Sequence, residues 1–140
     1  MPVSFLHSSE NFSLQKKAVL KKWISAIIKQ EKKKEGKIIF LFCNDKKLHS
    51  INKEFLNHDT LTDIITFDYS EGEKISGEIY ISTERVFENA EKFSGSFLEE
   101  LHRVMIHGVL HLCGYKDKSP ADKKQMRQKE EEALKKVIGY

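Results

Sequence analysis

The longest uninterrupted apolar run of the sequence is the hexapeptide IIFLFC at residues 38–43. Six residues is a typical strand length and is far short of the roughly 18 residues that a membrane-spanning helix needs. β-Branched and aromatic side chains favour strands, and a continuous apolar run is typical of a buried strand. We therefore expect residues 38–43 to form a buried strand within a globular protein.

Hydrophobic periodicity predicts the elements around this strand. The other expected strands are Val3–His7, at an edge, Ile64–Phe67 and Glu78–Ile81. Two helices are expected before residue 60: one that carries Leu14 to Ile28 and ends near Gly36, and a short one marked by Leu48 to Leu56. Three more are expected after the strands: Thr83–Phe93, Phe97–Cys113 and a last one from Pro120 toward Val137. The residues expected to point inward are Val86, Phe87, Ala90 and Phe93 on the first of these three, and Met126, Ala133, Leu134, Val137 and Ile138 on the last. Ser119 is the expected N-cap of the last helix, and Gly114 suits the left-handed residue beyond the helix before it.

The order of these elements predicts the fold class. Strands and helices interleave without strict βαβ regularity, so we expect an α+β fold with a mixed sheet of about four strands and about five helices. Gly72 lies in the loop that would join the last two strands as a hairpin. No repeat, low-complexity tract or flexible linker divides the sequence, so residues 1–140 are expected to form a single domain.

Composition and charge disfavour several classes of protein. Of the 140 residues, 39% are hydrophobic and 32% are charged, which suits a globular domain. A net charge of +3 does not by itself indicate a nucleic-acid binder. The two cysteines, Cys43 and Cys113, cannot form a disulfide framework, and free thiols suit a reducing cytosol. Because the first residues also lack the pattern of a signal peptide, we expect a cytoplasmic protein without a membrane segment.

His107 and His111 lie four residues apart on an expected helix, so both imidazoles leave the same face about one turn apart. A helix offers two nitrogens to one zinc ion at this spacing, and Asp117, beyond the turn at Gly114, can supply an oxygen. Three protein ligands with a fourth position left for water are typical of catalytic zinc. The alternative is a pair of ordinary core or surface histidines. We expect one zinc ion per chain, at the end of a central helix.

Gly108 directly follows the first histidine of this pair. Zinc proteases place their general-base glutamate at that position, so peptide hydrolysis by that mechanism is disfavoured. A glycine inside a helix costs about 1 kcal/mol relative to alanine. Its presence therefore indicates that another backbone or a substrate approaches the helix closely.

Three segments of the chain carry recognisable motifs, at residues 107–117, 51–67 and 77–82. Together they resemble the YbeY family of bacterial endoribonucleases. HGVLHLCGYKD at residues 107–117 is similar to the family signature HGxLHLxGYDH. Residues 51–67, which begin with IN and end with DTLTDIITF, resemble LNxxxRxxDxPTDVLSF, and GEIYIS at residues 77–82 resembles GDIxIS. The segments occur in the family's order, and the resemblance covers nearly the whole chain.

The resemblance implies an α+β fold with one zinc ion in a cleft beside the sheet. It also implies single-strand-specific cleavage of RNA, in 16S rRNA 3′-end maturation and in ribosome quality control. The partners that it implies are rRNA and the ribosome, with the small subunit as the expected part. It further implies that the metal ligands occupy positions 107, 111 and 117.

Two of the departures from the family pattern bear on the chemistry of the site. The third metal ligand of the family is histidine, where this chain has Asp117. Carboxylate oxygen binds zinc at about the same distance, so we expect the site to be kept, with a less acidic water and a wider choice of metals. The family's arginine falls at Leu56. Because phosphoryl transfer depends on positive charge near the transition state, His58, Lys116 or Lys118 is a candidate to replace it.

Three further residues are candidates for binding RNA. Asp59 and Thr62 either line the RNA cleft or organise the turn before the strand at residues 64–67. Tyr115 either stacks on a base, as aromatic residues do in single-strand recognition, or packs against the last helix. The sequence identifies no side chain as the general base.

Two other functions remain open on the sequence alone. The absence of arginine at position 56 favours a ribosome-associated assembly factor with little turnover, in which zinc is largely structural. The second alternative is a metal-dependent hydrolase of another substrate, including peptides by an atypical base. Our interpretation is a zinc-dependent endoribonuclease.

Overall fold

The computed structural model describes residues 3–7, 12–56 and 62–137, which form one four-stranded sheet of order β1-β2-β4-β3 with five helices. The strands are β1 (Val3–His7), β2 (Lys34–Cys43), β3 (Ile64–Asp68) and β4 (Lys74–Ser82). The helices are α1 (Lys17–Gln30), α2 (Asp45–Phe55), α3 (Thr83–Lys92), α4 (Phe97–Leu112) and α5 (Pro120–Leu134). β1, β2 and β4 are parallel, and β3 pairs antiparallel with β4. The predicted α+β class and mixed sheet are confirmed.

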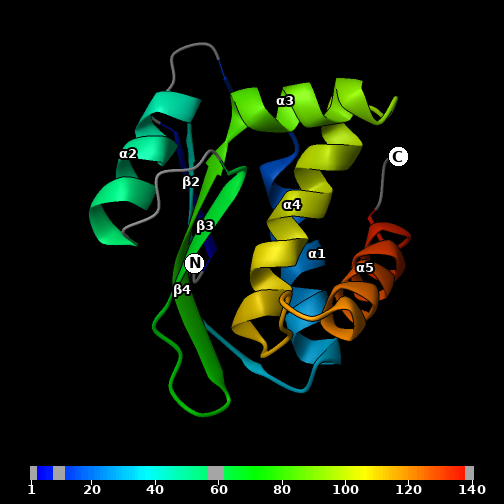
Figure 1. The fold of residues 1–140 in the computed structure, drawn as a ribbon. Coiled ribbons are helices and arrows are strands. Elements are labelled where there is room, and N and C mark those ends of the chain that lie inside the picture. The colour runs from blue at the N-terminus through cyan, green and yellow to red at the C-terminus, as the bar shows by residue number, and fades with distance from the viewer. Residues whose placement is uncertain (1–2, 8–11, 57–61, 138–140) are drawn as a thin grey trace.

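The helices cover the two faces of the sheet unequally (Figure 1). α1 and α4 pack against one face, and α5 packs on α4. Ile38, Phe40 and Phe42 of β2 are fully buried in this main core, which confirms the predicted buried strand. α2 covers the opposite face, where Leu48 and Ile51 belong to a second, smaller cluster. Two helices of the larger layer, α4 and α5, contribute residues to the candidate site.

The first helix is shorter than predicted. α1 ends at Gln30, and Gly36, which we expected near the end of that helix, lies inside β2. The chain turns between the two elements at Lys32, which has a φ of 60°. β4 passes so close to Gly36 that a Cβ there would collide with Oγ of Ser76 and the carbonyl oxygen of Ile75. The glycine therefore permits close strand pairing and does not end a helix.

α3 buries two of the four residues that the sequence pattern directed inward. Val86 and Ala90 are buried, whereas Phe87 and Phe93 are 51% and 70% exposed. Residues 86 and 90 share one stripe of the helix, while residue 87 lies about 100° further around it. Phe93 follows the last helical residue. The prediction that these two rings point inward is wrong, because the buried stripe of α3 is narrow.

α5 begins as predicted. The Ser119 hydroxyl accepts from the backbone N–H of Asp122, and the Asp122 carboxylate accepts from that of Ser119, so the two residues form a capping box. Of the residues that this helix was predicted to bury, Met126 and Ala133 are buried, and Leu134 and Val137 are half-buried. Ile138 lies outside the described residues. Trp23 Nε1 donates to the carbonyl oxygen of Ala133 at 2.9 Å, which ties α5 to α1.

α4 packs directly on the sheet at Gly108. A Cβ at this residue would lie 2.9 Å from the Ile79 side chain on β4 and 3.1 Å from the Ile64 side chain on β3. The helix is approached closely at this glycine, as expected, but by side chains of the sheet and not by a backbone or a substrate. The helix ends before Gly114, whose φ is 110°. Across the described residues, no helix combines the length and the apolar character that crossing a membrane requires.

Candidate active site

A cavity of about 600 Å³ is lined by residues of β3, α2, α4 and α5 and of the segments next to these elements. Its volume is within the range of small-molecule and cofactor sites. The three predicted metal ligands, His107, His111 and Asp117, all line it. Lys116 and Lys118, from the segment between α4 and α5, line it as well.

His107 and Asp117 lie close together in this cavity. Oδ2 of Asp117 is 3.7 Å from Nε2 of His107. Two atoms that bind one tetrahedral zinc ion at about 2.1 Å each lie about 3.4 Å apart. The observed separation therefore suits two ligands of one ion. The turn at Gly114 redirects the chain after α4 and allows the aspartate to reach the histidine.

The third predicted ligand is less closely placed. His111 is exposed and lines the same cavity one helical turn from His107. Within residues 3–7, 12–56 and 62–137, no group of three or more His, Cys, Asp or Glu side chains is arranged to hold a metal ion. The structure thus brings together two of the three predicted ligands, and the complete metal centre stays a prediction.

Glu130 of α5 contacts the other nitrogen of the His107 ring. Its Oε2 lies 2.6 Å from Nδ1 of His107, and its side chain is 7% exposed. Our sequence analysis missed this residue, although a signal was present. Glu130 shares the inner stripe of α5 with Met126 and Ala133, which are buried. A charged residue on such a stripe must find a partner in the interior.

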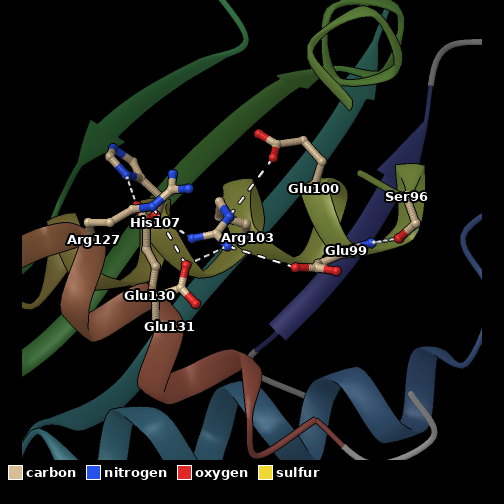
Figure 2. Close-up of polar contacts among 8 residues, drawn as sticks. All are labelled: Ser96, Glu99, Glu100, Arg103, His107, Arg127, Glu130 and Glu131. Carbon is tan, nitrogen blue, oxygen red and sulfur yellow. Dashed lines mark hydrogen bonds and ion pairs between the residues drawn. The ribbon is translucent and has the colours of Figure 1, made fainter. Parts of the chain in front are cut away.

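Arg103 of α4 is a second residue that the sequence analysis missed. Its guanidinium lies 3.3 Å from Glu130 and 2.8 Å from Glu131, both on α5 (Figure 2). The carboxylates of Glu99 and Glu100 lie 3.9 Å away on α4 itself. Arg103 precedes the first predicted ligand by four residues, so it lies on the same helix face. A charged residue within the apolar part of this helix was the signal available in the sequence.

Burial and neighbouring charges shift the pKa values of several groups in this cavity. Burial raises the pKa of Asp63, although the nearby His107 opposes the shift. Burial also raises the pKa of Glu100, against the influence of Arg103. For His107, burial favours the neutral ring most strongly, but the hydrogen bond and charge of Glu130 outweigh it and raise the pKa. The carboxylates around His107 thus favour a positive charge at this place.

The remaining predicted residues are distributed between this cavity and other places. Thr62 lines the cavity, and its hydroxyl donates to the carbonyl oxygen of Ile64 at 3.2 Å, as the turn interpretation expected. Leu56 lines the cavity and is 41% exposed, so no positive charge stands at its position. His58 and Asp59 lie outside the described residues.

Tyr115 does not belong to the residues that line this cavity. Its hydroxyl donates to Oε1 of Glu31, just beyond α1, at 2.6 Å. Nζ of Lys129 lies 5.7 Å from the centre of its ring. These contacts agree with the alternative in which Tyr115 packs against the last helix.

Arg127 is a cation of the cavity that our sequence analysis did not assign. It lines the cavity from α5, and its side chain is 65% exposed. Its Nε lies 3.6 Å from Glu131, and exposed pairs of this kind contribute little. The guanidinium is therefore available to an anion that enters from solvent.

Known proteins similar to this chain point to one family. The family model described as Endoribonuclease YbeY matches residues 5–138. The chain belongs to the YbeY family. A relative named Endoribonuclease YbeY, from Flavobacterium johnsoniae, is 54% identical over 132 residues, which cover 94% of each chain. A relative of the same name from Flavobacterium psychrophilum is 57% identical over 125 residues, which cover 89% of each chain.

A solved structure has a similar fold. The solution structure of TM1509 from Thermotoga maritima is similar to this one with a TM-score of 0.67 and 28% sequence identity, over 96% of this chain and 88% of that one. The YbeY match confirms the resemblance drawn from the three sequence segments. Because it extends from residue 5 to residue 138, the whole of the cavity, including its α5 wall, lies within the matched region.

Proposed function

We propose that this protein is a zinc-dependent endoribonuclease that cuts single-stranded RNA, acting on rRNA of the small ribosomal subunit in 16S 3′-end maturation and ribosome quality control. The relatives named Endoribonuclease YbeY support the RNA-cutting activity. The observation that carries the proposal is the pair His107 and Asp117, 3.7 Å apart in a cavity that exposed cations also line.

The donor set of the cavity fits zinc. Two imidazoles and one carboxylate, from His107, His111 and Asp117, are ligand types of catalytic zinc sites. Nδ1 of His107 is engaged by Glu130, which leaves Nε2 on the side of Asp117. When bound, zinc would supply a Lewis acid for a phosphoryl oxygen and would lower the pKa of a coordinated water to about 7. We propose one ion per chain.

The chain's own cations would hold the RNA backbone. Lys116, Lys118 and Arg127 line the cavity and are exposed, so they can neutralise phosphates as a strand enters. Arg103 is unsuited to this task, because carboxylates already surround its buried guanidinium. The three exposed cations are therefore better candidates than Arg103 to compensate for the uncharged Leu56.

A single strand fits this site better than a duplex. The bases of a single strand can leave the stack and enter a concave site, whereas paired bases of A-form RNA are held within the helix. Thr62, which lines the cavity, and Asp59 are proposed to contact the strand, and so is Tyr115 if the RNA extends beyond the cavity. His58 remains a candidate for the charge near the reacting phosphate.

A second function is supported by a specific observation. Leu56 places an uncharged side chain on the wall where a cation would assist phosphoryl transfer. A ribosome-associated assembly factor with little turnover would not need that charge. The protein would then bind the small subunit and hold zinc without cutting RNA.

The test uses untagged protein, because a histidine tag would bind metal itself. A single-stranded rRNA fragment and the same fragment in a duplex are incubated with zinc-loaded wild type, His111→Ala and His7→Ala, which removes an exposed histidine of β1 as a control. We expect cleavage of the single strand by wild type and His7→Ala, and none by His111→Ala. Co-sedimentation with ribosomes without zinc-dependent cleavage would favour the assembly factor.

A further inference from the structure

We propose that Glu130 is a positioning residue that fixes the ring of His107 so that Nε2, and not Nδ1, faces the cavity and Asp117. Arg103 in turn holds the carboxylate of Glu130. The role of this arrangement in metal binding rests on the proposed function, because His107 must present the lone pair of Nε2 in order to bind zinc. The arrangement itself belongs to the folded chain and can be measured without metal.

The geometry around the ring selects one tautomer. A neutral imidazole has one N–H donor and one acceptor nitrogen, and an ionised carboxylate only accepts. Since Oε2 of Glu130 lies 2.6 Å from Nδ1 of His107, the hydrogen belongs on Nδ1. The lone pair is then on Nε2, which is 3.7 Å from Oδ2 of Asp117. A carboxylate that accepts from one nitrogen of a histidine orients the other nitrogen toward a metal.

The carboxylate of Glu130 is itself fixed from a second side. Its Oε1 accepts from Nη1 of Arg103 at 3.3 Å, while its Oε2 faces the His107 ring (Figure 2). The Glu130 side chain is 7% exposed and that of Arg103 is 10% exposed. Water therefore competes little for either group, and the chain from Arg103 through Glu130 to His107 stays in one geometry.

A purely structural role is the alternative, since the same contacts join α4 to α5. The chain offers a control for that role. Glu131 also joins the two helices through Arg103, at 2.8 Å, but its other ion pair is with Arg127 and not with His107. A variant at Glu131 weakens the connection between the helices without touching the ring. Only Glu130 should affect the ring and the metal.

The experiment measures the tautomer of His107 in metal-free, untagged, ¹⁵N-labelled protein by two-bond ¹H–¹⁵N correlation spectra, in alkaline buffer where the ring is neutral. We expect the Nδ1–H tautomer in wild type and in Glu131→Gln. In Glu130→Gln the amide can donate as well as accept, so the Nε2–H tautomer gains population. Zinc affinity, measured by chelator competition, should fall about 10–100-fold in Glu130→Gln and stay unchanged in Glu131→Gln.

Three results would overturn the proposal: an Nε2–H tautomer in wild type, an unchanged tautomer and zinc affinity in Glu130→Gln, or equal changes in the two variants. The wild-type spectrum decides even if Glu130→Gln does not fold. If wild type binds no zinc but shows the expected tautomer and its loss in Glu130→Gln, the positioning role stands and the proposed zinc-dependent function fails.

Discussion

Two arginines each join two helices in this protein, and the networks around them end differently. Arg85 of α3 contacts Asp45 of α2 at 2.8 Å and Glu88 of α3 at 2.7 Å. Asp45 also accepts from the Ser82 hydroxyl, at the end of β4, at 2.6 Å. None of these residues is among those that line the cavity. This network holds α2, α3 and the end of β4 together.

The Arg103 network uses the same chemistry but extends to the candidate site. It joins α4 to α5 through Glu130 and Glu131, and the Glu130 carboxylate ends on the ring of His107. The contrast lies in the group that the last carboxylate touches, which is a hydroxyl in one region and a cavity-facing imidazole in the other. A buried arginine with its carboxylates is therefore not enough to indicate a functional site. The indication comes from the group that the last carboxylate contacts.

The largest effect is expected where the Arg103 network reaches the cavity. His107→Ala removes a proposed zinc ligand, so we expect loss of bound zinc and a fall in RNA cleavage of at least about 100-fold, because a catalytic metal contributes several kcal/mol. Metal content by mass spectrometry and single-turnover cleavage rates measure the two effects. Retention of zinc at wild-type stoichiometry would separate His107 from the metal site.

The next prediction compares two variants, each of which replaces one carboxylate of a network by an amide. Glu130→Gln should weaken zinc binding about 10–100-fold. Asp45→Asn should leave zinc affinity unchanged and lower the free energy of unfolding by about 1–2 kcal/mol, because hydrogen bonds between charged groups are weakened. Chelator competition and urea unfolding measure both quantities in both variants. Equal loss of zinc affinity in Asp45→Asn would remove the distinction between the two regions.

A third prediction contrasts the buried arginine with the exposed one. Arg127→Gln should weaken binding of single-stranded RNA several-fold and reduce the slope of log affinity against log salt by about 0.7–1, the value of one phosphate contact. Lys124→Gln is the matched control, because Lys124 is exposed on the same helix and is not among the residues that line the cavity. Fluorescence anisotropy across a salt series measures the slopes. Identical slopes for the two variants would exclude a phosphate contact by Arg127.

The last prediction concerns His102, a buried histidine on α4 away from the cavity. Burial lowers the pKa of His102 to about 4, in contrast to the raised pKa of His107. The unfolded chain protonates His102 at its ordinary pKa near 6.5, so the unfolded state binds more protons between about pH 6.5 and 4. Stability should therefore fall with decreasing pH across this window, by up to about 3 kcal/mol from this group.

His102→Phe tests this pH dependence. Urea unfolding of wild type and variant at a series of pH values gives the two slopes, and the variant should lose the part that His102 contributes. The ring of His102 lies 6.0 Å from that of Trp23, so an aromatic replacement retains a ring at this contact. Parallel pH profiles for the two proteins would show that His102 does not resist protonation in the folded state.

Periodicity and local chemistry predicted the elements of the fold well. The strand at residues 38–43 and the Ser119 cap were confirmed. Gly108 is approached closely, although by the side chains of Ile79 and Ile64 and not by a backbone or a substrate. Two errors arose where tertiary contacts decide. Gly36 reads as the end of a helix in sequence but lies against β4, and the ring of Phe87 is left outside the narrow contact of α3.

The two candidate histidine ligands on α4 could be predicted from the sequence, whereas the contact of α5 with one of them could not. His107 and His111 show their spacing within one helix, and Asp117 follows a turn marked by glycine. The contact of Glu130 with His107 spans 23 residues and depends on how α5 crosses α4. No local pattern encodes that crossing, although a carboxylate on the inner stripe of α5 shows that a partner is required.

The central claim is that His107, oriented by Glu130, binds one zinc ion together with His111 and Asp117. X-ray absorption at the zinc edge of untagged, zinc-loaded protein tests it most directly, because the spectrum reports the type and number of coordinating atoms. The account predicts two imidazole nitrogens and further oxygen donors, with one imidazole lost in His111→Ala. A thiolate in the coordination sphere, or a spectrum unchanged by His111→Ala, would contradict it.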